Sequence, residues 1–484
     1  MSDRDGDTAS DRGFELYLDT SPGERRAALI DMDANGGGRL ERLQIDRDSR
    51  PAFVETIFAA RLTALDKQTG AGFLELGPAG QGMLAKTNKL TEGASVIVQV
   101  SREATGAKGV AVTRAWMVRE RYLAWTAARK GISWAKSIGQ GRTRAGLEQA
   151  LQAALEQMDD PSLADGLSVR APAVAVGQAA LLADLKRLAA RRDAVMQAGA
   201  QARPPQQLEA PLEMAMMAVR DAPAGTHVAT DDRALFQRLK QRATTDWPDL
   251  VDGLAFSDPS RGAMFDLAGV SDLLEEALSR TVAIPGGGRL TIDRTEAMSV
   301  IDVDSGNSAD GGGLKEEAVF RLNKRACEEA VRQIRLRNLS GLIVIDCVTL
   351  RAKGRMRALL EALRGLVKAD PVTTDVLGVS AAGLIEITRQ RTGPSLSEIM
   401  HRPALDPAPA ADAQACAILR AALRLTGPGR PVAVASEGVE RVLSGPLADA
   451  RAECDRRLGR PLEIKRGPDS VPAHVELVRG EGTR

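Results

Sequence analysis

A multidomain α/β protein is the fold class that the sequence predicts, and three observations support it. The chain has 484 residues, which is enough for several domains because a typical domain has about 150 residues. Residues 51–115 contain consecutive short strand patterns with turn residues between them, which predicts a small β domain. Residues 298–350 contain two apolar strands (299–304 and 341–346), separated by a glycine-rich turn (311–313) and a long basic helical segment (316–337). This pattern is typical of an α/β sheet.

The composition allows hydrophobic cores but gives no overall attraction to nucleic acid. Hydrophobic residues make up 44% of the chain and aromatic residues only 3%, so the cores must consist mainly of Leu, Val, Ile and Ala. The 65 basic and 64 acidic residues leave a net charge of +1. A nucleic-acid surface would therefore have to come from local clustering of basic residues.

The cysteines and the apolar runs indicate the cellular compartment. No two cysteines form a CxxC pair, which argues against a disulfide scaffold and against a cysteine-based zinc clip within one chain. No apolar run approaches the roughly 20 residues of a membrane helix, and the N-terminus is charged, unlike a signal peptide. We therefore expect a soluble cytoplasmic protein without membrane contact. The four cysteines are Cys327, Cys347, Cys416 and Cys454.

The N-terminal segment is too short to be a domain. Residues 1–12 are polar and acidic, and we expect them to be disordered. Three strand patterns follow, and an Asn-Gly-Gly-Gly turn at 35–38 predicts a hairpin between the last two. We expect these strands to pair with a later segment. The strand patterns cover residues 14–18, 26–31 and 40–46.

The next segment predicts a small barrel. Five strand patterns within about 65 residues suit a barrel of the oligonucleotide-binding (OB) type. On such a barrel, Phe73 would be a stacking ring and Lys108 a phosphate contact. The alternative for Phe73 is a side chain that fills the core, which is the more frequent role of a lone aromatic residue. The strand patterns cover residues 53–58, 60–65, 72–76, 94–100 and 109–113.

Residues 117–280 alternate between helix and strand patterns. Thr143 is a candidate N-cap for an amphipathic helix, and the basic face of the later Ala-rich helix is most often solvated charge. The lone His227 is expected to be structural, because no cysteine or second histidine lies nearby in the sequence. The expected strands are 121–125, 166–170 and 225–230, and the expected helices are 143–158, 176–200 and 231–242.

Two apolar strand patterns each end in aspartate residues, and they are the main candidates for a catalytic site. Asp302 and Asp304 close the first strand and Asp346 closes the second. Residues i and i+2 of a strand share a face, so Asp302 and Asp304 are expected to point the same way. Carboxylates are ligands that Mg²⁺ prefers, which suggests a metal site for phosphate chemistry. The alternative is ordinary strand-end aspartates in caps and turns, which is the more frequent case on spacing alone.

The rest of the chain continues the α/β pattern. A helix at 352–367 and strands near 376 and at 383–388 follow Asp346, and the basic Arg389 comes directly after them. Residues 403–409 are rich in proline and alanine and read as a linker. Residues 412–484 alternate helix and strand patterns and read as a small α/β unit.

Several long motifs, in order, resemble those of the ribonuclease E/G family of bacterial RNA endonucleases. The segments 301–306 (IDVDSG), 332–346 (RQIRLRNLSGLIVID) and 383–396 (GLIEITRQRTGPSL) resemble its two acidic motifs and the motif that follows them. Residues 91–113 look like the end of that family's S1 barrel, and residues 474–480 look like its closing strand. The likeness runs from about residue 14 to the end of the chain.

The resemblance implies a specific architecture. An RNase H-like fold would be split around an inserted S1 (OB-type) β-barrel and a 5′-sensor region. A DNase I-like catalytic domain and a small C-terminal α/β domain would follow. The implied parts are a disordered N-terminus (1–13), the RNase H-like halves (14–50 and 206–280), the S1 barrel (51–116), the sensor region (117–205), the catalytic domain (281–398), a linker (399–411) and the C-terminal domain (412–484).

The resemblance also implies a reaction and its residues. The activity would be Mg²⁺-dependent hydrolysis of single-stranded RNA that leaves 5′-phosphate ends, in RNA processing and decay, with Mn²⁺ as an alternative ion. Asp302 and Asp346 would hold the metal, which lowers the pKa of an attacking water. Asp304, the third catalytic position, stands where the family usually has Asn, so its carboxylate could bind metal directly or add repulsion. Phe73, Lys108, Arg170 and Arg389 would contact RNA.

Departures from the family pattern predict differences in function. The sensor Arg170 is kept, but Ala171 replaces a Thr, and losing a hydrogen bond to a charged group removes roughly 1.5–3 kcal/mol. We expect weak or absent 5′-end sensing. The family's CPxC zinc link is missing at 400–403, so we expect no structural zinc, and the homodimer that stays open as a partner would form without a zinc clip. Met83 also stands where a second barrel aromatic is usual. Together with Asp304 and the lost sensor Thr, it favours the alternative function, a catalytically impaired RNA-binding protein on the same scaffold.

Overall fold

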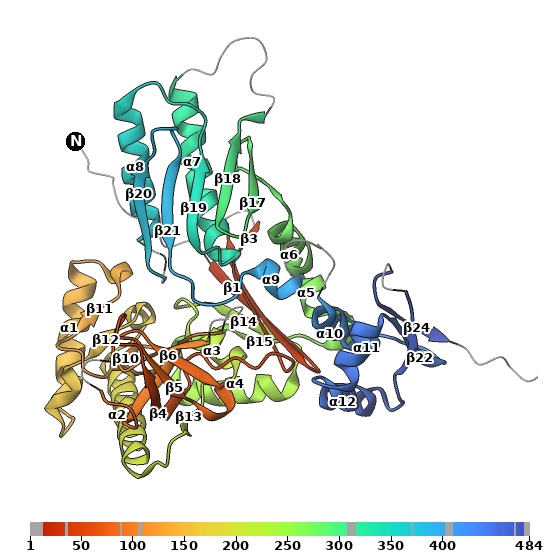
Figure 1. Cartoon of the computed structure of the whole chain (residues 1–484), viewed down its shortest axis with the longest axis horizontal. Helices are drawn as coiled ribbons and strands as arrows, with labels where there is room; N and C mark the ends of the chain where they lie inside the picture. The colour runs from red at the N-terminus through yellow and green to blue at the C-terminus, as the bar shows by residue number, and fades with distance from the viewer. Residues whose placement is uncertain are drawn as a thin grey trace, which may run out of the picture. The chain divides into compact units, whose positions relative to one another are not determined.

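The computed structural model forms two compact units, and each is described by itself (Figure 1). The first consists mainly of Ala52–Ser257 and the second mainly of Asp258–Arg484, while the N-terminal strands contribute residues to both. The expected N-terminal disorder, part of the 35–38 turn, Lys108, the 311–313 glycines and the 403–409 linker lie outside the described residues. The structure describes residues 13–33, 37–87, 90–104, 109–306, 316–368, 370, 372–401, 410–468 and 471–478.

A closed five-stranded barrel lies in the first unit, as the sequence predicted. The strands hydrogen-bond in the order β4-β5-β6-β8-β7, and β7 pairs back to β4. The side chains of Phe58, Leu62, Leu74 and Val98 fill the interior without solvent exposure. The barrel strands are β4 (Ile57–Leu65), β5 (Gly72–Glu75), β6 (Gln81–Leu84), β7 (Ser95–Arg102) and β8 (Val110–Thr113).

Two details of the predicted barrel are wrong. The first strand starts at Ile57 rather than at residue 53 and continues unbroken through the break expected near 59. Glu55 has a positive φ of 72°, and the backbone N–H groups of Phe53 and Val54 donate to the Glu103 carboxylate instead of to a ladder. Strand β6 was missed because four residues, one of them glycine, carry too little alternation to be recognised.

The remainder of the first unit packs helices against a four-stranded sheet of order β11-β12-β10-β9. Helix α1 (Arg142–Leu155) has Gly141 at its N-cap, without a side-chain capping bond. The prediction that Thr143 caps this helix is therefore wrong, because the helix starts before that residue. The other elements are β9 (Met117–Arg119), β10 (Leu123–Thr126), β11 (Ser133–Trp134), β12 (Leu167–Val169), α2 (Gln178–Gln201), β13 (Gln206–Glu209) and α3 (Met214–Arg220).

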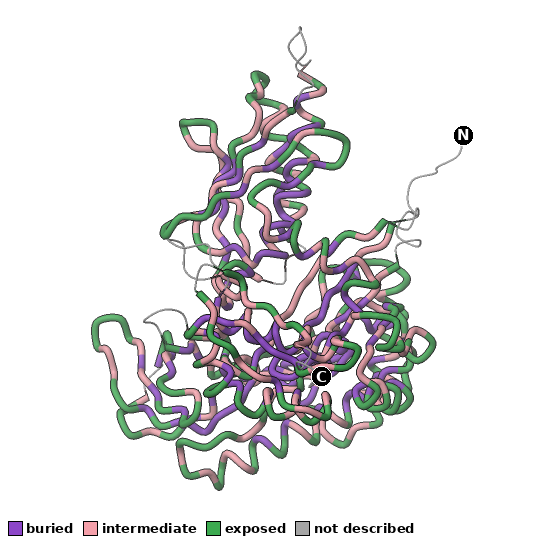
Figure 2. Tube along the Cα trace, turned by 90° about the vertical axis from the view of Figure 1, so that its right-hand side faces the viewer, coloured by how far each residue is buried: buried purple, intermediate pink, exposed green. Residues whose placement is uncertain are grey.

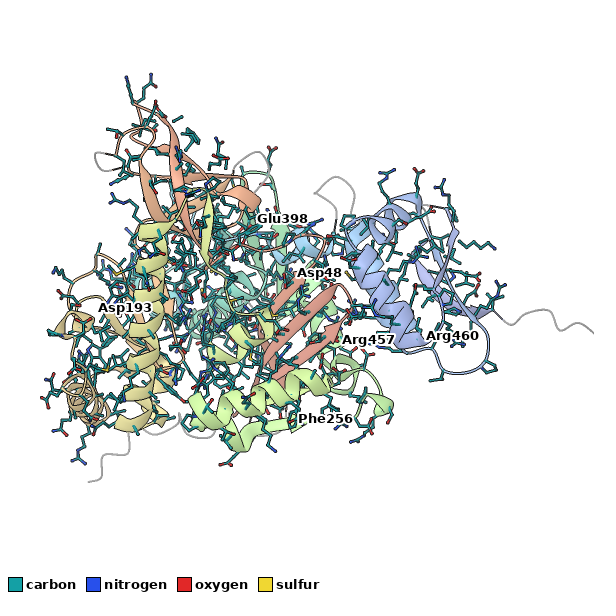
Figure 3. All side chains as sticks on the ribbon, turned by 90° about the horizontal axis from the view of Figure 1, so that it is seen from below. Asp48, Asp193, Phe256, Glu398, Arg457 and Arg460 are labelled. Atoms are coloured by element: carbon teal, nitrogen blue, oxygen red, sulfur yellow. The ribbon has the colours of Figure 1, made fainter. Side chains whose placement is uncertain are left out.

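The N-terminal strands pair with later ones, which confirms that they are not a domain alone. They belong to a sheet of order β15-β14-β1-β2-β3. Phe256, labelled in Figure 3, lies at the end of β15. Its ring contacts that of Phe236 on helix α4, with the ring centroids 5.7 Å apart. The RNase H-like name of this part stays a prediction. The elements are β1 (Gly13–Ser21), β2 (Glu24–Met32), β3 (Gly38–Arg47), β14 (His227–Thr230), α4 (Arg233–Asp246) and β15 (Leu254–Phe256).

A six-stranded mixed sheet forms the main part of the second unit, with the order β16-β17-β18-β19-β21-β20. Helices α7 and α8 pack on one face of it, because alternate residues such as Ile301, Ile343 and Ile387 are buried against Ala326 and Leu363. The elements are α5 (Met264–Leu267), α6 (Val270–Leu278), β16 (Thr281–Ala283), β17 (Arg289–Arg294), β18 (Met298–Asp304), α7 (Glu316–Leu336), β19 (Gly341–Asp346), α8 (Lys353–Val367), β20 (Thr374–Val379) and β21 (Ile385–Arg389).

The C-terminal part of the second unit is a small α/β layer, as predicted. Strand β22 lies between β23 and β24. The helices of this layer bury Cys416 and Cys454 in its core. Buried positions, drawn purple in Figure 2, alternate with intermediate and exposed ones along the chain. Among the helices of the described residues, none has the length and apolar character needed to span a membrane. The elements are α9 (Leu396–Met400), α10 (Ala411–Ala422), β22 (Arg430–Ala435), α11 (Glu437–Ser444), α12 (Ala448–Leu458), β23 (Glu463–Arg466) and β24 (His474–Val478).

Candidate active site

Two carboxylates lie side by side at the end of the parallel strand pair β18 and β19. Asp302 is directly opposite Asp346 in the ladder, and neighbouring strands are about 4.8 Å apart. Both residues are exposed, whereas Ile301 and Ile345, one residue before each, are fully buried on the helix-covered face. The two carboxylates therefore share the sheet face that α7 and α8 leave uncovered. The shared face predicted for Asp302 and Asp304 also agrees with the alternating burial of β18.

Asp304 is held by two hydrogen bonds. Arg289 on β17 lies directly opposite it, and its Nη2 donates to Oδ2 over 2.7 Å. The backbone N–H of Gly306 donates to Oδ1 over 2.9 Å. The Gly306 N–H and then Arg289 hold the pKa of this carboxyl below its usual range. Sequence reasoning missed Arg289, although the alternation in 289–293 could have placed it on the aspartate face.

The chemistry of the donor set fits a hard divalent cation. Mg²⁺ is usually bound by one or two carboxylates, with waters and substrate phosphates completing an octahedron. Asp302 and Asp346 supply such a pair at one edge. Among the residues that the structure describes, no group of three or more His, Cys, Asp or Glu side chains could hold a metal. The ladder register makes this pair of carboxylates the candidate site, and it would rely on substrate and solvent oxygens for the remaining ligands.

Helix α7 fixes the loop that follows Asp346. Asn323 is completely buried; its Nδ2 donates to the Val348 carbonyl over 2.7 Å, and its Oδ1 accepts the Val348 N–H over 3.1 Å. At the start of the same helix, Glu316 accepts the N–H groups of Arg351 and Ala352. These contacts hold the backbone directly after Asp346. Sequence reasoning missed Asn323, whose signal was a polar residue on the apolar side of the helix.

Arg389 lies inside the same domain rather than on its surface. Only 5% of the residue is exposed, and its Nε donates to Asp370 over 2.8 Å. Its Nη1 donates to the Asn338 side chain and to the Leu339 carbonyl. These bonds give Arg389 a structural role in closing the end of β21 against neighbouring loops. The RNA contact expected of it stays a prediction.

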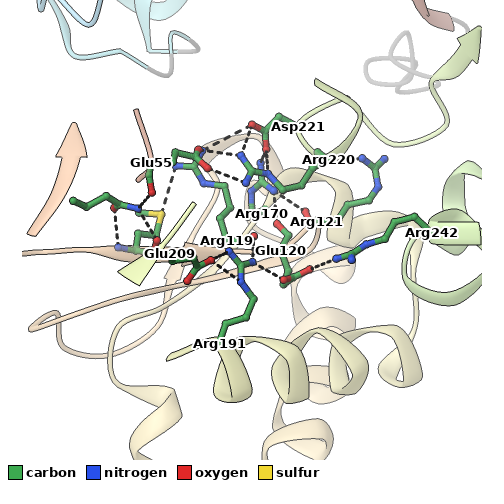
Figure 4. A network of polar contacts seen from close by, with 12 residues as sticks. Glu55, Arg119, Glu120, Arg121, Arg170, Arg191, Glu209, Arg220, Asp221 and Arg242 are labelled. Carbon is green, nitrogen blue, oxygen red and sulfur yellow. Dashed lines mark hydrogen bonds and ion pairs between the residues drawn. The ribbon is translucent and has the colours of Figure 1, made fainter. Parts of the chain in front are cut away.

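Arg170, the expected sensor residue, lies within a network of charged groups in the first unit (Figure 4). It donates to the carbonyls of Glu120 and Arg121 and to the Asp221 carboxylate. Burial would raise the pKa of Asp221, but Arg170 and Arg220 outweigh it and hold the pKa below its usual range. The Arg170 guanidinium is thus already engaged by its own chain, and its contact with RNA stays a prediction.

Phe73 lies outside the barrel core. In β5 its neighbour Leu74 is fully buried, whereas Phe73 is partly exposed on the other face. It stands opposite Met83 of β6 in the ladder. The alternative role, a side chain that fills the core, is therefore wrong, because Leu74 takes that place. Lys108 lies outside the described residues, so its predicted phosphate contact has no structural description.

A family model described as the Ribonuclease E/G family matches residues 118–392, more than half of the chain. The chain belongs to the ribonuclease E/G family. The matched range of this ribonuclease E/G chain contains Asp302, Asp304 and Asp346 as well as Arg170 and Arg389. The barrel and the C-terminal α/β layer lie outside the matched range.

Named relatives agree with the family assignment. Ribonuclease G of Escherichia coli K12 is 28% identical over 411 residues, which are 80% of this chain and 81% of that protein. Ribonuclease E of Haemophilus influenzae is 30% identical over 407 residues, which are 79% of this chain and 42% of that protein. Ribonuclease E of Escherichia coli K12 is 29% identical over 406 residues. The resemblance read from the motifs is therefore confirmed.

Proposed function

We propose that this chain is an endoribonuclease that hydrolyses single-stranded RNA in RNA processing and decay, leaving 5′-phosphate ends. Asp302 and Asp346 would hold Mg²⁺, with Mn²⁺ as an alternative. The observation that carries the proposal is the ladder register that puts these two carboxylates opposite each other. The names of similar proteins, ribonucleases G and E, also support the proposal.

The proposed reaction is hydrolysis of one phosphodiester bond. A bound divalent ion supplies Lewis-acid chemistry, lowering the pKa of a water and offsetting phosphate charge. The oxygen of water bonds to phosphorus and the bond from phosphorus to the 3′ oxygen breaks. The upstream fragment then ends in a 3′-hydroxyl and the downstream fragment in a 5′-phosphate. The role of Asp302 and Asp346 is to present their oxygens together at the open face of the sheet.

The barrel supports binding of single-stranded RNA. Unstacked bases can stack on an exposed aromatic ring in a sequence-tolerant way. Phe73 is partly exposed on the outer side of β5, with the apolar Met83 opposite. This arrangement offers one ring rather than two, so we expect a weaker stacking platform than a pair of aromatic residues would give.

The proposal is tested by cleavage of one A/U-rich RNA offered single-stranded and as a duplex. The full chain with Mg²⁺ is expected to cut the single strand only, and chelation with EDTA is expected to stop the reaction. Adding a labelled phosphate to the 5′ end of the downstream product should require prior removal of the 5′-phosphate already there. Products with a 5′-hydroxyl, or undiminished cleavage in EDTA, would contradict the proposed chemistry.

A second candidate function is RNA binding without cleavage on the same scaffold. It is favoured by the carboxylate at position 304 and by the engagement of Arg170 with Asp221. Tight binding of the single strand with no cleavage in either Mg²⁺ or Mn²⁺ would support this candidate. Cleavage in either ion excludes it. The absence of structural zinc and the cytoplasmic location also remain proposals.

A further inference from the structure

The hairpin of β17 and β18 places an arginine across from the third aspartate of the candidate site. Asp304 follows Asp302 by two residues on the same face, so the two positions are about 7 Å apart along the strand. Arg289 lies opposite Asp304 in the ladder and pairs with it over 2.7 Å. Sequence reasoning left two roles open for Asp304, a direct metal ligand or a source of repulsion.

From this geometry we infer that Arg289 is a positioning residue that neutralises Asp304 and keeps it from becoming a third metal ligand. The inference rests on the proposed function and concerns the same site. It assigns the cation to Asp302 and Asp346 alone. It also explains how the chain can carry a carboxylate beside a site that must receive an RNA phosphate.

Each oxygen of Asp304 already accepts a hydrogen bond from its own chain. Oδ1 accepts the Gly306 N–H and Oδ2 accepts Arg289 Nη2. Two glycines with positive φ frame this arrangement, Gly306 at 65° and Gly288 at 91°. A Cβ on Gly288 would lie 2.8 Å from the Asp304 carbonyl oxygen, so glycine permits the close approach at this end of the hairpin. The local backbone therefore supports the pair from both sides.

The charge of Arg289 matters because the proposed substrate is an anion. A free carboxylate beside the metal pair would attract the cation more strongly and repel the phosphates of RNA. The Arg289 guanidinium removes that excess negative charge while remaining mostly exposed, with 61% of its side chain accessible. A single exposed ion pair has a small effect on stability, so substitutions here should change binding without unfolding the domain.

The test is a double-mutant cycle with Arg289→Ala, Asp304→Asn and the combined variant. Calorimetric titration of each variant with Mg²⁺ alone, and RNA binding without divalent ions, give two readouts that need no cleavage. Arg289→Ala should bind Mg²⁺ more tightly and RNA more weakly, each by about threefold. Asp304→Asn alone removes one negative charge and should bind Mg²⁺ more weakly, by up to about threefold. The loss should be no larger, because Asn keeps an oxygen for the Gly306 N–H. The combined variant should match the wild type in both readouts.

A metal-ligand role for Asp304 would give a different pattern and overturn the inference. Asp304→Asn would then lose Mg²⁺ affinity by about tenfold or more, and the combined variant would be as weak. The same titration on Asp302→Asn separates this failure from failure of the proposed function. If Asp302→Asn binds Mg²⁺ as well as the wild type, the proposed metal pair itself is wrong.

A matched control comes from the C-terminal layer. Arg430 and Glu463 form an ion pair over 2.6 Å, and 63% and 44% of their side chains are exposed, similar to the Arg289 pair. Arg430→Ala and Glu463→Gln should leave both affinities unchanged. Changes of the same size in these variants would mean that any exposed ion pair acts through net charge, and the specific role of Arg289 would be rejected.

Discussion

The side chain of Arg170 is engaged by hydrogen bonds within its own chain, which reduces its availability to bind a phosphate. Arg170, which the resemblance predicts to be the sensor arginine, donates to two carbonyls and to Asp221 of its own chain. Ala171, which follows it, has no hydroxyl to offer a phosphate. The structure therefore gives a second physical reason, besides the missing Thr, to expect poor sensing of a 5′-monophosphate.

The first prediction concerns that sensing. Cleavage rates of one RNA with a 5′-monophosphate or a 5′-hydroxyl should be equal, because Asp221 competes for the Arg170 guanidinium. Asp221→Asn removes the competing charge, and a preference for the 5′-monophosphate should then emerge. A strong preference in the wild type would contradict this account of the sensor region.

At the same scale, some site residues could be predicted from the sequence and others could not. The positions of Asp302 and Asp346 at the ends of two neighbouring strands could be predicted, because strand alternation depends on nearby residues. Their role as metal ligands stays a prediction. Arg289 was not recognised because its importance depends on hairpin register, and a shift of one residue would reverse its face. The burial of Arg389 depends on contacts with Asp370 and Asn338, which adjacency in sequence does not reveal.

Among the elements, helix α7 has the clearest link to the candidate site. It packs its apolar side on the sheet and uses buried Asn323 to hold the backbone of Val348, two residues after Asp346. Its first residue, Glu316, holds the backbone further along the same loop. A helix predicted from its pattern alone thus turns out to support the loop beside a carboxylate of the site.

The second prediction follows from this support. Asn323→Ala should reduce cleavage and leave both polar groups of Val348 without a partner, which costs about 1–3 kcal/mol. Hydrogen exchange should increase locally at residues 347–352. Lys324→Ala, at the next and exposed position of the helix, is the control and should change neither quantity. Unaltered exchange in Asn323→Ala would show that the loop does not depend on this contact.

Long periodic elements were predicted well, and short ones were not. Helices α7 and α8 and the central strands β18 and β19 start and end close to the positions expected. Strand β6 was not predicted because its four residues carry too little alternation. The exact start of β4 was not predicted because the positive φ of Glu55 breaks the pattern just before it. The N-cap of α1 was also wrong, since a glycine starts that helix without a side-chain bond.

In the whole molecule, a network of buried ion pairs holds the first unit together. Arg121 is completely buried and donates to the Asp249 carboxylate and to the carbonyls of Val219 and Ala222. Burial and then Asp249 raise the pKa of the adjacent Tyr122 above its usual range. Removing one partner of such a pair leaves an uncompensated buried charge.

The third prediction uses this pair. Asp249→Asn should destabilise the first unit by about 3–5 kcal/mol. Tryptophan fluorescence during urea unfolding reports on this unit, because Trp116, Trp125, Trp134 and Trp247 all lie within it. The control is Glu213→Gln, at the exposed Arg238 pair, which should change stability by less than about 1 kcal/mol. Equal effects of the two substitutions would contradict the role assigned to the buried pair.

The division into two units could not be read from the sequence. The domain order predicted by the family resemblance treated the N-terminal segment as one half of a domain. In the structure, the strands of that segment contribute residues to both units. Strand pairing between segments that are distant in sequence decides this division, and local periodicity carries no information about it. The predicted domain boundaries therefore remain predictions.

The central claim is that Asp302 and Asp346 act together on one metal ion, and cleavage by their variants in Mg²⁺ tests it most directly. In Asp302→Asn and Asp346→Asn, the cleavage rate should fall by about 100-fold or more. Mutating a residue that only hydrogen-bonds to a metal ligand already lowers metal affinity or activity by about 10–100-fold. The double variant should be little worse than either single one, because the two residues hold the same ion. Full cleavage by both single variants would contradict the account.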